Sequence, residues 1–181
     1  MPLMFQPLAR YFDFNGRSRR SEYWLWTLFQ IVVGMAFGAL QGALEPGNPF
    51  GAVFAARVVY FIALFIPNLA VGVRRFHDIN RTGWWIVFPL VVTIIAFIVY
   101  ISSHGMGFIT DIENFSKLGP HPAPAEAMAA MTTLMGPFLW IYLPALLASL
   151  VTLIFTVLDG TAGPNRFGND PKGRGGNPGV F

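Results

Sequence analysis

Four long stretches of this chain consist almost entirely of apolar residues, and they limit its possible folds more than any other feature. The stretches cover residues 23–44, 56–73, 84–101 and 133–158. A helix needs about 20 mostly apolar residues to cross the hydrocarbon layer of a membrane, because every backbone amide must find its hydrogen-bond partner within the segment. Only 12% of the residues are charged, about half the share of a soluble domain. Each stretch is therefore predicted to be a membrane-spanning helix.

The predicted fold is an all-α integral membrane protein with four transmembrane helices in a single domain, residues 1–181. A polar leader, residues 1–22, precedes the first span, and a tail, residues 159–181, follows the last. A short helical segment outside the membrane is expected between the third and fourth spans. A cleaved secretory signal is not expected, because the first apolar stretch is too long and lies behind a polar leader.

The distribution of basic residues predicts that both termini are cytoplasmic. Cytoplasmic loops of membrane proteins carry an excess of Lys and Arg. The leader, the link between the second and third spans and the tail hold all but two of the 12 basic residues. These are Arg10, Arg17, Arg19, Arg20, Arg74, Arg75, Arg81, Arg166, Lys172 and Arg174. Only Arg57 and Lys117 would lie on the other side.

Small residues and prolines mark the predicted spans. Gly34, Gly38 and Gly42 recur every four residues, and such stripes let helices approach closely in lipid. They predict packing within the bundle or a homo-oligomer formed through this face. Kinks are expected where prolines remove helical amides, at Pro67, Pro89, Pro137 and Pro144. The side chain of Asn68 is placed to replace the bond lost at Pro67 or to bond a neighbouring helix.

Several classes of function are disfavoured. No Asp, Glu, Lys, Arg or His lies deep inside a span, which counts against pumps and ion-driven carriers. The net charge of +3 is too small to indicate a nucleic-acid partner. The chain has no cysteine, so disulfides and thiolate catalysis are excluded. No metal or other cofactor is expected, because the loop histidines His104 and His121 lack the tight spacing of metal ligands.

Polar residues gather in the three predicted cytoplasmic segments. In the leader, Ser18 is a predicted N-cap, and Arg19 is spaced to pair with Glu22 on the first helical turn. In the link, a helix continuing past the membrane surface would place four residues on one face, and these are Arg74, His77, Asp78 and Arg81. The tail adds a turn-rich stretch that includes Arg166 and Asp170.

Three motifs in these segments together resemble a known family. They read Gly-Arg-x-x-Arg-x-Glu-Tyr-Trp before the first span, Arg-Arg-x-His-Asp-x-x-Arg-x-Gly-Trp-Trp in the link and Asn-Arg-Phe-Gly-Asn-Asp-Pro after the last span. Over nearly the whole chain the sequence resembles the domain-of-unknown-function 805 family of bacterial inner-membrane proteins. The resemblance implies a multi-pass protein of the inner (plasma) membrane, with no established activity, substrate or catalytic residue.

Two interpretations of the basic cluster stay open. Guanidinium groups bind phosphate through two parallel hydrogen bonds, which favours a site for an anionic lipid headgroup or a small phosphate compound. Its residues would be Arg17, Arg20, Arg74, Arg75, His77 and Arg81. The other interpretation is a structural ion-pair network that holds leader, link and tail together, formed by Arg19, Glu22, Asp78, Asp159, Arg166 and Asp170.

The predicted function is accordingly that of a non-catalytic inner-membrane protein, either a scaffold or a binder of anionic membrane lipid. A small channel or carrier is the alternative from another class. A membrane-embedded enzyme is the remaining one, with His77 beside Asp78 as a general base. No Gly-rich phosphate loop and no metal-binding motif accompanies this pair.

Overall fold

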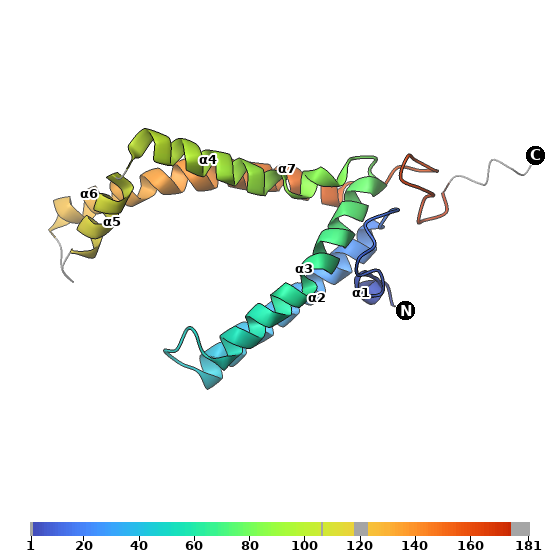
Figure 1. Ribbon diagram of the computed structural model, residues 1–181, viewed down its shortest axis with the longest axis horizontal. Coiled ribbons are helices and arrows are strands. Elements are labelled where there is room, and N and C mark those ends of the chain that lie inside the picture. The colour runs from blue at the N-terminus through green and yellow to red at the C-terminus, as the bar shows by residue number, and fades with distance from the viewer. Residues whose placement is uncertain (1, 106, 118–122, 175–181) are drawn as a thin grey trace, which may run out of the picture. The chain divides into compact units, whose positions relative to one another are not determined.

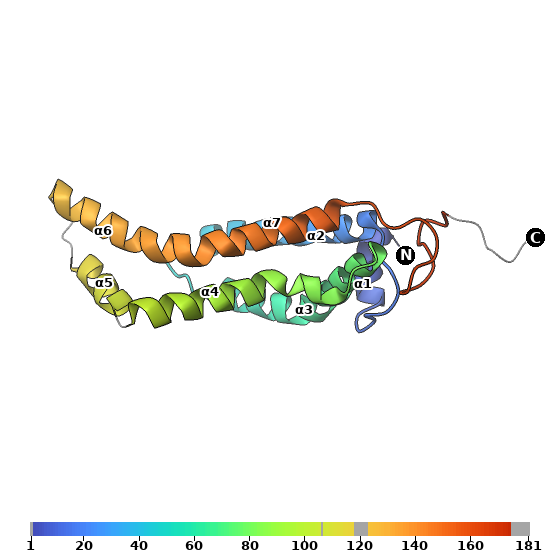
Figure 2. The same cartoon turned by 90° about the horizontal axis from the view of Figure 1, so that it is seen from above.

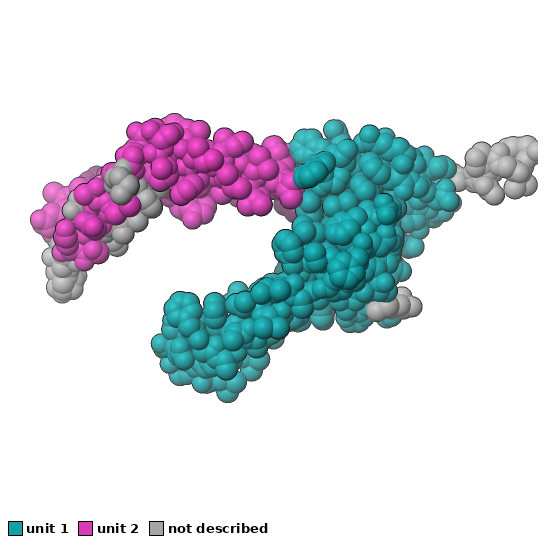
Figure 3. All heavy atoms as spheres, in the orientation of Figure 1, with its two compact units in different colours: residues 1–86, 155–181 teal, residues 87–154 magenta. Residues whose placement is uncertain are grey.

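The computed structural model describes residues 2–105, 107–117 and 123–174 of the chain. Within them every regular element is a helix or a helical turn, and one isolated bridge pairs Asn165 with Gly168. The predicted all-α class is confirmed in this part of the chain. The loop histidine His121 lies outside the described residues. The chain divides into two compact units, residues 1–86 with 155–181 and residues 87–154 (Figure 3).

The first unit is built on two long helices. They are α2 (Arg20–Leu44) and α3 (Ala52–Asp78), which pack against each other (Figures 1 and 2). The leader contributes a short turn, η1 (Leu3–Phe5), which contacts α2, and a short helix, α1 (Gln6–Ala9), which contacts α2 and α3. After α3, a turn called η2 (Gly83–Ile86) folds back against that helix.

The second unit contains the remaining helices. They are α4 (Phe88–His104), α5 (Gly107–Ser116), α6 (Pro124–Pro137), the π-helical turn η3 (Phe138–Tyr142) and α7 (Leu143–Val157), whose end belongs to the first unit. The last three elements follow one another without a break, and both α4 and α6 contact η3. The helical segment predicted between the third and fourth spans corresponds to α5 and the beginning of α6.

Three helices among the described residues are long and apolar enough to cross a membrane. They are α2, α3 and the continuous helix Pro124–Val157. The third predicted span, 84–101, begins with η2, and its α-helix has only 17 residues. Such a helix is about 25 Å long, which is less than the roughly 30 Å of the hydrocarbon layer. The four-span topology, the cytoplasmic termini and the single domain therefore stay predictions.

Pro67 lies inside α3 and removes one backbone hydrogen bond from that helix. A residue of the leader supplies a replacement for it. Proline lacks the amide that would bond the carbonyl four residues earlier, which belongs to Ala63. The hydroxyl of Tyr11 donates to that carbonyl. The side chain of Asn68 instead accepts a hydrogen bond of 2.5 Å from the indole of Trp26 in α2. Of the two roles predicted for Asn68, the bond to a neighbouring helix is confirmed.

Pro89 does not interrupt a helix as predicted. It lies in the first turn of α4, where a helical amide has no intrahelical partner to lose. Pro144 is the second residue of α7, which follows the π-helical turn η3 directly, and such turns form where the regular hydrogen-bond ladder is disturbed.

The glycine stripe of α2 faces open space within the described residues. A Cβ atom built on Gly34, Gly38 or Gly42 meets no atom within 4 Å. The stripe is therefore not used in the contact between α2 and α3. The homo-oligomer through this face stays a prediction.

We expect Gly38→Cys to form disulfide-linked dimers in native membranes if the stripe joins two copies, because the chain has no other cysteine. Non-reducing electrophoresis after mild oxidation measures the product. Leu40→Cys is the matched control, because Leu40 is also exposed but lies on a different face of α2. Equal crosslinking at both positions, or none at Gly38, would contradict the prediction.

Candidate functional site

A buried carboxylate, Asp78, lies at the centre of the cluster that the sequence indicated. It is the last residue of α3, and it is 1% exposed. Its two oxygens receive guanidinium groups from different segments, Arg17 of the leader at 2.9 Å and Arg75 of α3 at 2.7 Å. A buried charge is tolerated only when it is paired and hydrogen-bonded, and both conditions are met here.

Arg75 connects the end of α3 to the end of α7. Besides Asp78, its guanidinium donates to the carbonyl of Thr156 at 3.0 Å and to the carbonyl of Leu158. The last carbonyls of a helix have no intrahelical partner, and a basic side chain that bonds them also interacts favourably with the helix dipole. Arg75 is fully buried, so it acts as an internal C-terminal cap for α7.

Arg17 connects the leader to the tail. Its terminal nitrogens donate to the carbonyls of Thr161 at 2.5 Å and Gly163 at 2.7 Å, while its Nε donates to Asp78 at 3.0 Å. The residue is 5% exposed. Three segments that are far apart in the sequence thus meet on one guanidinium group.

Arg74 connects α3 to the leader and to α2. It donates to the backbone carbonyls of Arg10 at 3.2 Å and Asp13 at 2.5 Å, and it pairs with the carboxylate of Glu22 at 3.3 Å. Glu22 is 3% exposed. The pairing predicted within the leader, between Arg19 and Glu22, is replaced by this longer-range pair.

The predicted N-cap Ser18 is one residue too early. The N-cap of α2 is Arg19, which makes no side-chain cap. Ser18 is buried, its amide donates to the carbonyl of Arg74 at 3.0 Å, and its hydroxyl has no partner among the described residues. The leader therefore meets α3 through its backbone before α2 begins.

The other predicted arginines lie at the edge of the cluster. Arg20 is exposed and donates to the carbonyl of Val157 at 3.3 Å, and Arg19 donates to that of Pro171 at 3.0 Å. Arg81 follows the end of α3, so it does not share the helical face predicted for it. Its guanidinium lies over the rings of two aromatic residues, 5.9 Å from Trp85 and 5.3 Å from Phe155.

His77 contacts a ring of the tail. The rings of His77 and Phe167 are parallel within 3° with centroids 3.8 Å apart, and Arg166 lies over Phe167 at 4.7 Å. The Nδ1 of His77 lies 3.1 Å from the carbonyl oxygen of Gly16. Arg166 makes no ion pair among the described residues, and its guanidinium donates to the carbonyl of Asn80 at 3.2 Å.

The remaining predicted acids lie in the tail, and Asp170 is also 3.9 Å from the guanidinium group of Arg17 in the leader. Asp159 pairs with Lys172 and with Arg174 at 2.7 Å, and Asp170 accepts a bond of 2.9 Å from Arg174. The ammonium of Lys172, followed by the guanidinium of Arg174, lowers the pKa of Asp159 to about 2. The side chain of Asp159 is half exposed, and exposed pairs of this kind contribute little to stability. Sequence reasoning did not identify these two basic partners.

Gly160 was also not identified, although it packs directly against the central carboxylate. A Cβ atom on Gly160 would lie 2.1 Å from Oδ2 of Asp78. The next residue, Thr161, donates its amide to the carbonyl of Asp78 at 2.9 Å. Nothing in the sequence distinguishes this glycine from the 18 others, because the close contact arises only in the folded chain.

Gly160→Ala is expected to lower the free energy of unfolding by about 1–3 kcal/mol, the usual cost of overpacking. Asp78 cannot move away from the new methyl group without losing its bonds to Arg17 and Arg75. Thermal unfolding in detergent measures the change. Gly38→Ala is the control and is expected not to destabilise, because its Cβ position is open and alanine favours helix. Equal losses in both variants would contradict the packing argument.

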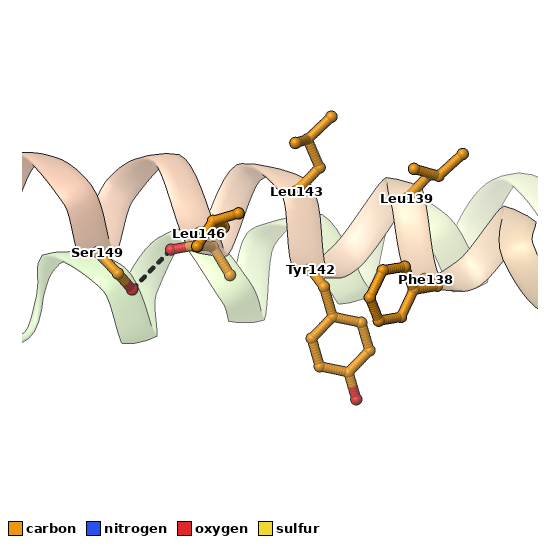
Figure 4. Close-up of a pocket in the computed structure, with 7 residues that line it drawn as sticks. Phe138, Leu139, Tyr142, Leu143, Leu146 and Ser149 are labelled. Carbon is orange, nitrogen blue, oxygen red and sulfur yellow. Dashed lines mark hydrogen bonds between the residues drawn. The ribbon is translucent and has the colours of Figure 1, made fainter.

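The second unit has an apolar hollow of 390 Å³ along η3 and α7 (Figure 4). It is lined by Phe138, Leu139, Tyr142, Leu143, Ala145, Leu146 and Ser149. The hydroxyl of Ser149 donates to the carbonyl of Ala145 in its own helix at 2.8 Å. Among the described residues, no Asp, Glu, His, Lys or Arg lines this hollow, and we assign no chemistry to it.

Comparison with known proteins agrees with the motifs. A family model described as "Protein of unknown function (DUF805)" matches residues 11–169. The inner membrane protein YhaI of Escherichia coli K12 is 28% identical over 165 residues, which cover 91% of this chain and 91% of that protein. The inner membrane protein YhaH of the same strain is 34% identical over 115 residues, or 64% of this chain and 91% of that protein. No solved structure matches the chain.

Proposed function

This chain belongs to the DUF805 family, and we propose that it is a structural, non-catalytic protein of the bacterial inner membrane. The proposal rests on one observation. Three buried arginines donate their hydrogen bonds to backbone carbonyls and carboxylates of the protein itself. We call them, with their two carboxylates, the arginine clasp, and its members are Arg17, Glu22, Arg74, Arg75 and Asp78. The clasp joins the leader, the end of α3, the end of α7 and the tail.

The donors of the clasp are already used within the protein. A phosphate group needs free guanidinium donors, but those of the clasp bond backbone carbonyls and buried carboxylates. The Nε of Arg74 is the one clasp nitrogen without a partner among the described residues, and it is buried. A phosphate that took the other donors would leave buried carbonyls unsatisfied, at a cost of about 1–3 kcal/mol each. This cost favours the structural network over an anion site at the centre of the cluster.

Hydrogen exchange of backbone amides tests the proposal. The amides of Ser18 and Thr161 bond the backbone carbonyls of Arg74 and Asp78, so they report whether leader and tail are held. In nanodiscs of pure phosphatidylcholine we expect both amides to be protected, and phosphatidylglycerol or inorganic phosphate should not increase the protection. The amide of Phe50 is the unprotected control, because its one hydrogen bond within the described part of the chain goes to the side chain of Asn48 in an exposed turn.

A different pattern of amide exchange would contradict the structural proposal. If the two amides exchange freely in phosphatidylcholine and become protected only when anionic lipid or phosphate is added, the cluster requires an anion to assemble. The structural proposal would then be wrong.

A second candidate function rests on the exposed arginines at the edge of the clasp. Arg81 is exposed, makes no ion pair among the described residues and lies over Trp85, an aromatic type that is enriched at membrane interfaces. Arg20 is also exposed and bonds one carbonyl. We propose that Arg81, with Arg20, contacts the headgroup of an anionic membrane lipid.

Native mass spectrometry after extraction from membranes that contain phosphatidylglycerol tests this contact. Arg81→Gln is expected to lower the fraction of protein that retains phosphatidylglycerol. Arg57→Gln is the matched control, because Arg57 is also exposed and lies over an aromatic ring, that of Phe61 at 5.6 Å, near the opposite end of α3. Equal retention by both variants and by the native protein would rule out the contact.

A further inference from the structure

The leader, expected to be cytoplasmic, contacts the apolar middle of the two long helices. The hydroxyl of Tyr11 donates to the carbonyl of Ala63 in α3. The ring of Phe5 packs edge-on against Phe29 of α2, with centroids 5.5 Å apart, and Pro7 is buried. The first part of the leader therefore runs along α2 and α3 instead of extending away from them.

The position of Ala63 along α3 indicates how deep this contact lies. At 1.5 Å per residue, Ala63 is about 16 Å from Arg74 along the helix axis. Half of the hydrocarbon layer measures roughly 15 Å, and charged groups such as those of the clasp belong at or beyond its edge. Ala63 then lies near the middle of the bilayer, so a side chain that reaches it must come from a segment inside the cytoplasmic leaflet.

The outer face of the same segment is apolar. Phe12 is 76% exposed and Leu8 is 37% exposed. Arg10 is the only charged residue between positions 2 and 12, and its guanidinium is paired with Asp13 at 2.7 Å. Large exposed apolar side chains are unfavourable in water but not against lipid tails, and the neighbouring helices α2 and α3 also expose large apolar side chains.

We propose that residues 2–12 form a membrane-embedded segment in the cytoplasmic leaflet, with Leu8 and Phe12 in contact with lipid acyl chains. Within it, Tyr11 supplies the hydrogen bond that Pro67 removes from α3. Arg74 bonds the carbonyls of Arg10 and Asp13 and thereby fixes where the chain leaves the lipid. Short amphipathic segments that lie within a membrane interface bury their apolar face in this way.

Fluorescence quenching at single cysteines tests the proposal, since the native chain has none. Phe12→Cys carries a nitrobenzoxadiazole label in vesicles of phosphatidylcholine and phosphatidylglycerol, with doxyl-labelled lipid or iodide as quencher. We expect quenching by the lipid and protection from iodide. Asn15→Cys is the control, because Asn15 is exposed just beyond the segment, and it should be quenched by iodide. Leu8→Cys gives the same measurement if Phe12→Cys does not fold.

The outcomes separate the possible surroundings of the segment. Iodide quenching at Phe12 or Leu8 equal to that at Asn15 would place the segment in water and overturn the proposal. Protection from both quenchers would mean that protein covers it, either the same chain or a second copy, and lipid would be the wrong occupant. The clasp is judged independently, because the exchange of the Thr161 amide reports the clasp and not the leader's depth.

Discussion

Asp78→Asn is expected to lower the free energy of unfolding by about 3–5 kcal/mol, the range for breaking a buried ion pair. The variant leaves the guanidinium groups of Arg17 and Arg75 buried without their shared negative charge. Asparagine keeps the volume of the side chain and can accept one hydrogen bond, so the loss reports charge and not packing. Thermal or denaturant unfolding in detergent measures it.

Asp159→Asn provides the matched control for this substitution. Asp159 also meets two basic groups, Lys172 and Arg174, but its side chain is half exposed. Exposed pairs contribute little because water and salt screen them, so no measurable change in stability is expected. Equal losses in the two variants would contradict the view that burial makes the clasp important.

A double-mutant cycle sharpens the test. Arg75→Met is expected to cost less in the Asp78→Asn background than in the native protein, because the guanidinium group that has lost its carboxylate is then removed as well. Full recovery is not expected, since Arg75 also bonds the carbonyls of Thr156 and Leu158. Strict additivity of the two losses would show that the pair does not act as one unit.

The helical part of the fold follows from properties that are visible along the chain. Long uncharged apolar stretches need internal hydrogen bonding in lipid, and α2 and α3 were placed correctly for that reason. The α-helix expected from Trp84 begins instead at Phe88, with Pro89 in its first turn. The length of the apolar stretch did not reveal that the residues before α4 form the separate turn η2.

The cluster itself was predictable in composition but not in pairing. The distribution of basic residues predicted that Arg17, Arg74 and Asp78 lie on the same side of the membrane. Their partners are mostly backbone carbonyls, such as that of Thr161, and a carbonyl is present at every residue, so it leaves no signal in the sequence. For the same reason the short-range pair expected for Glu22 was replaced by a pair with Arg74, because tertiary contact brought a closer cation.

Arg74→Met is expected to lower the free energy of unfolding by about 3 kcal/mol, the lower end of the range for a broken buried pair. It leaves the carboxylate of Glu22 buried at 3% exposure without its cation. It also removes the donor that bonds the carbonyls of Arg10 and Asp13. The leader should therefore loosen as stability falls, and trypsin should cleave after Arg10 faster than in the native protein.

Two further variants identify the cause of this loss. Arg81→Met makes the same change at an exposed arginine that has no ion pair among the described residues, and it is expected to change neither stability nor cleavage. Glu22→Gln combined with Arg74→Met should recover part of the stability, because the buried charge is gone. Cleavage after Arg10 should stay fast in that double variant, since the carbonyls of the leader still lack their donor. If cleavage slowed together with the recovery, Glu22 and not the leader carbonyls would be the contact through which Arg74 holds the leader.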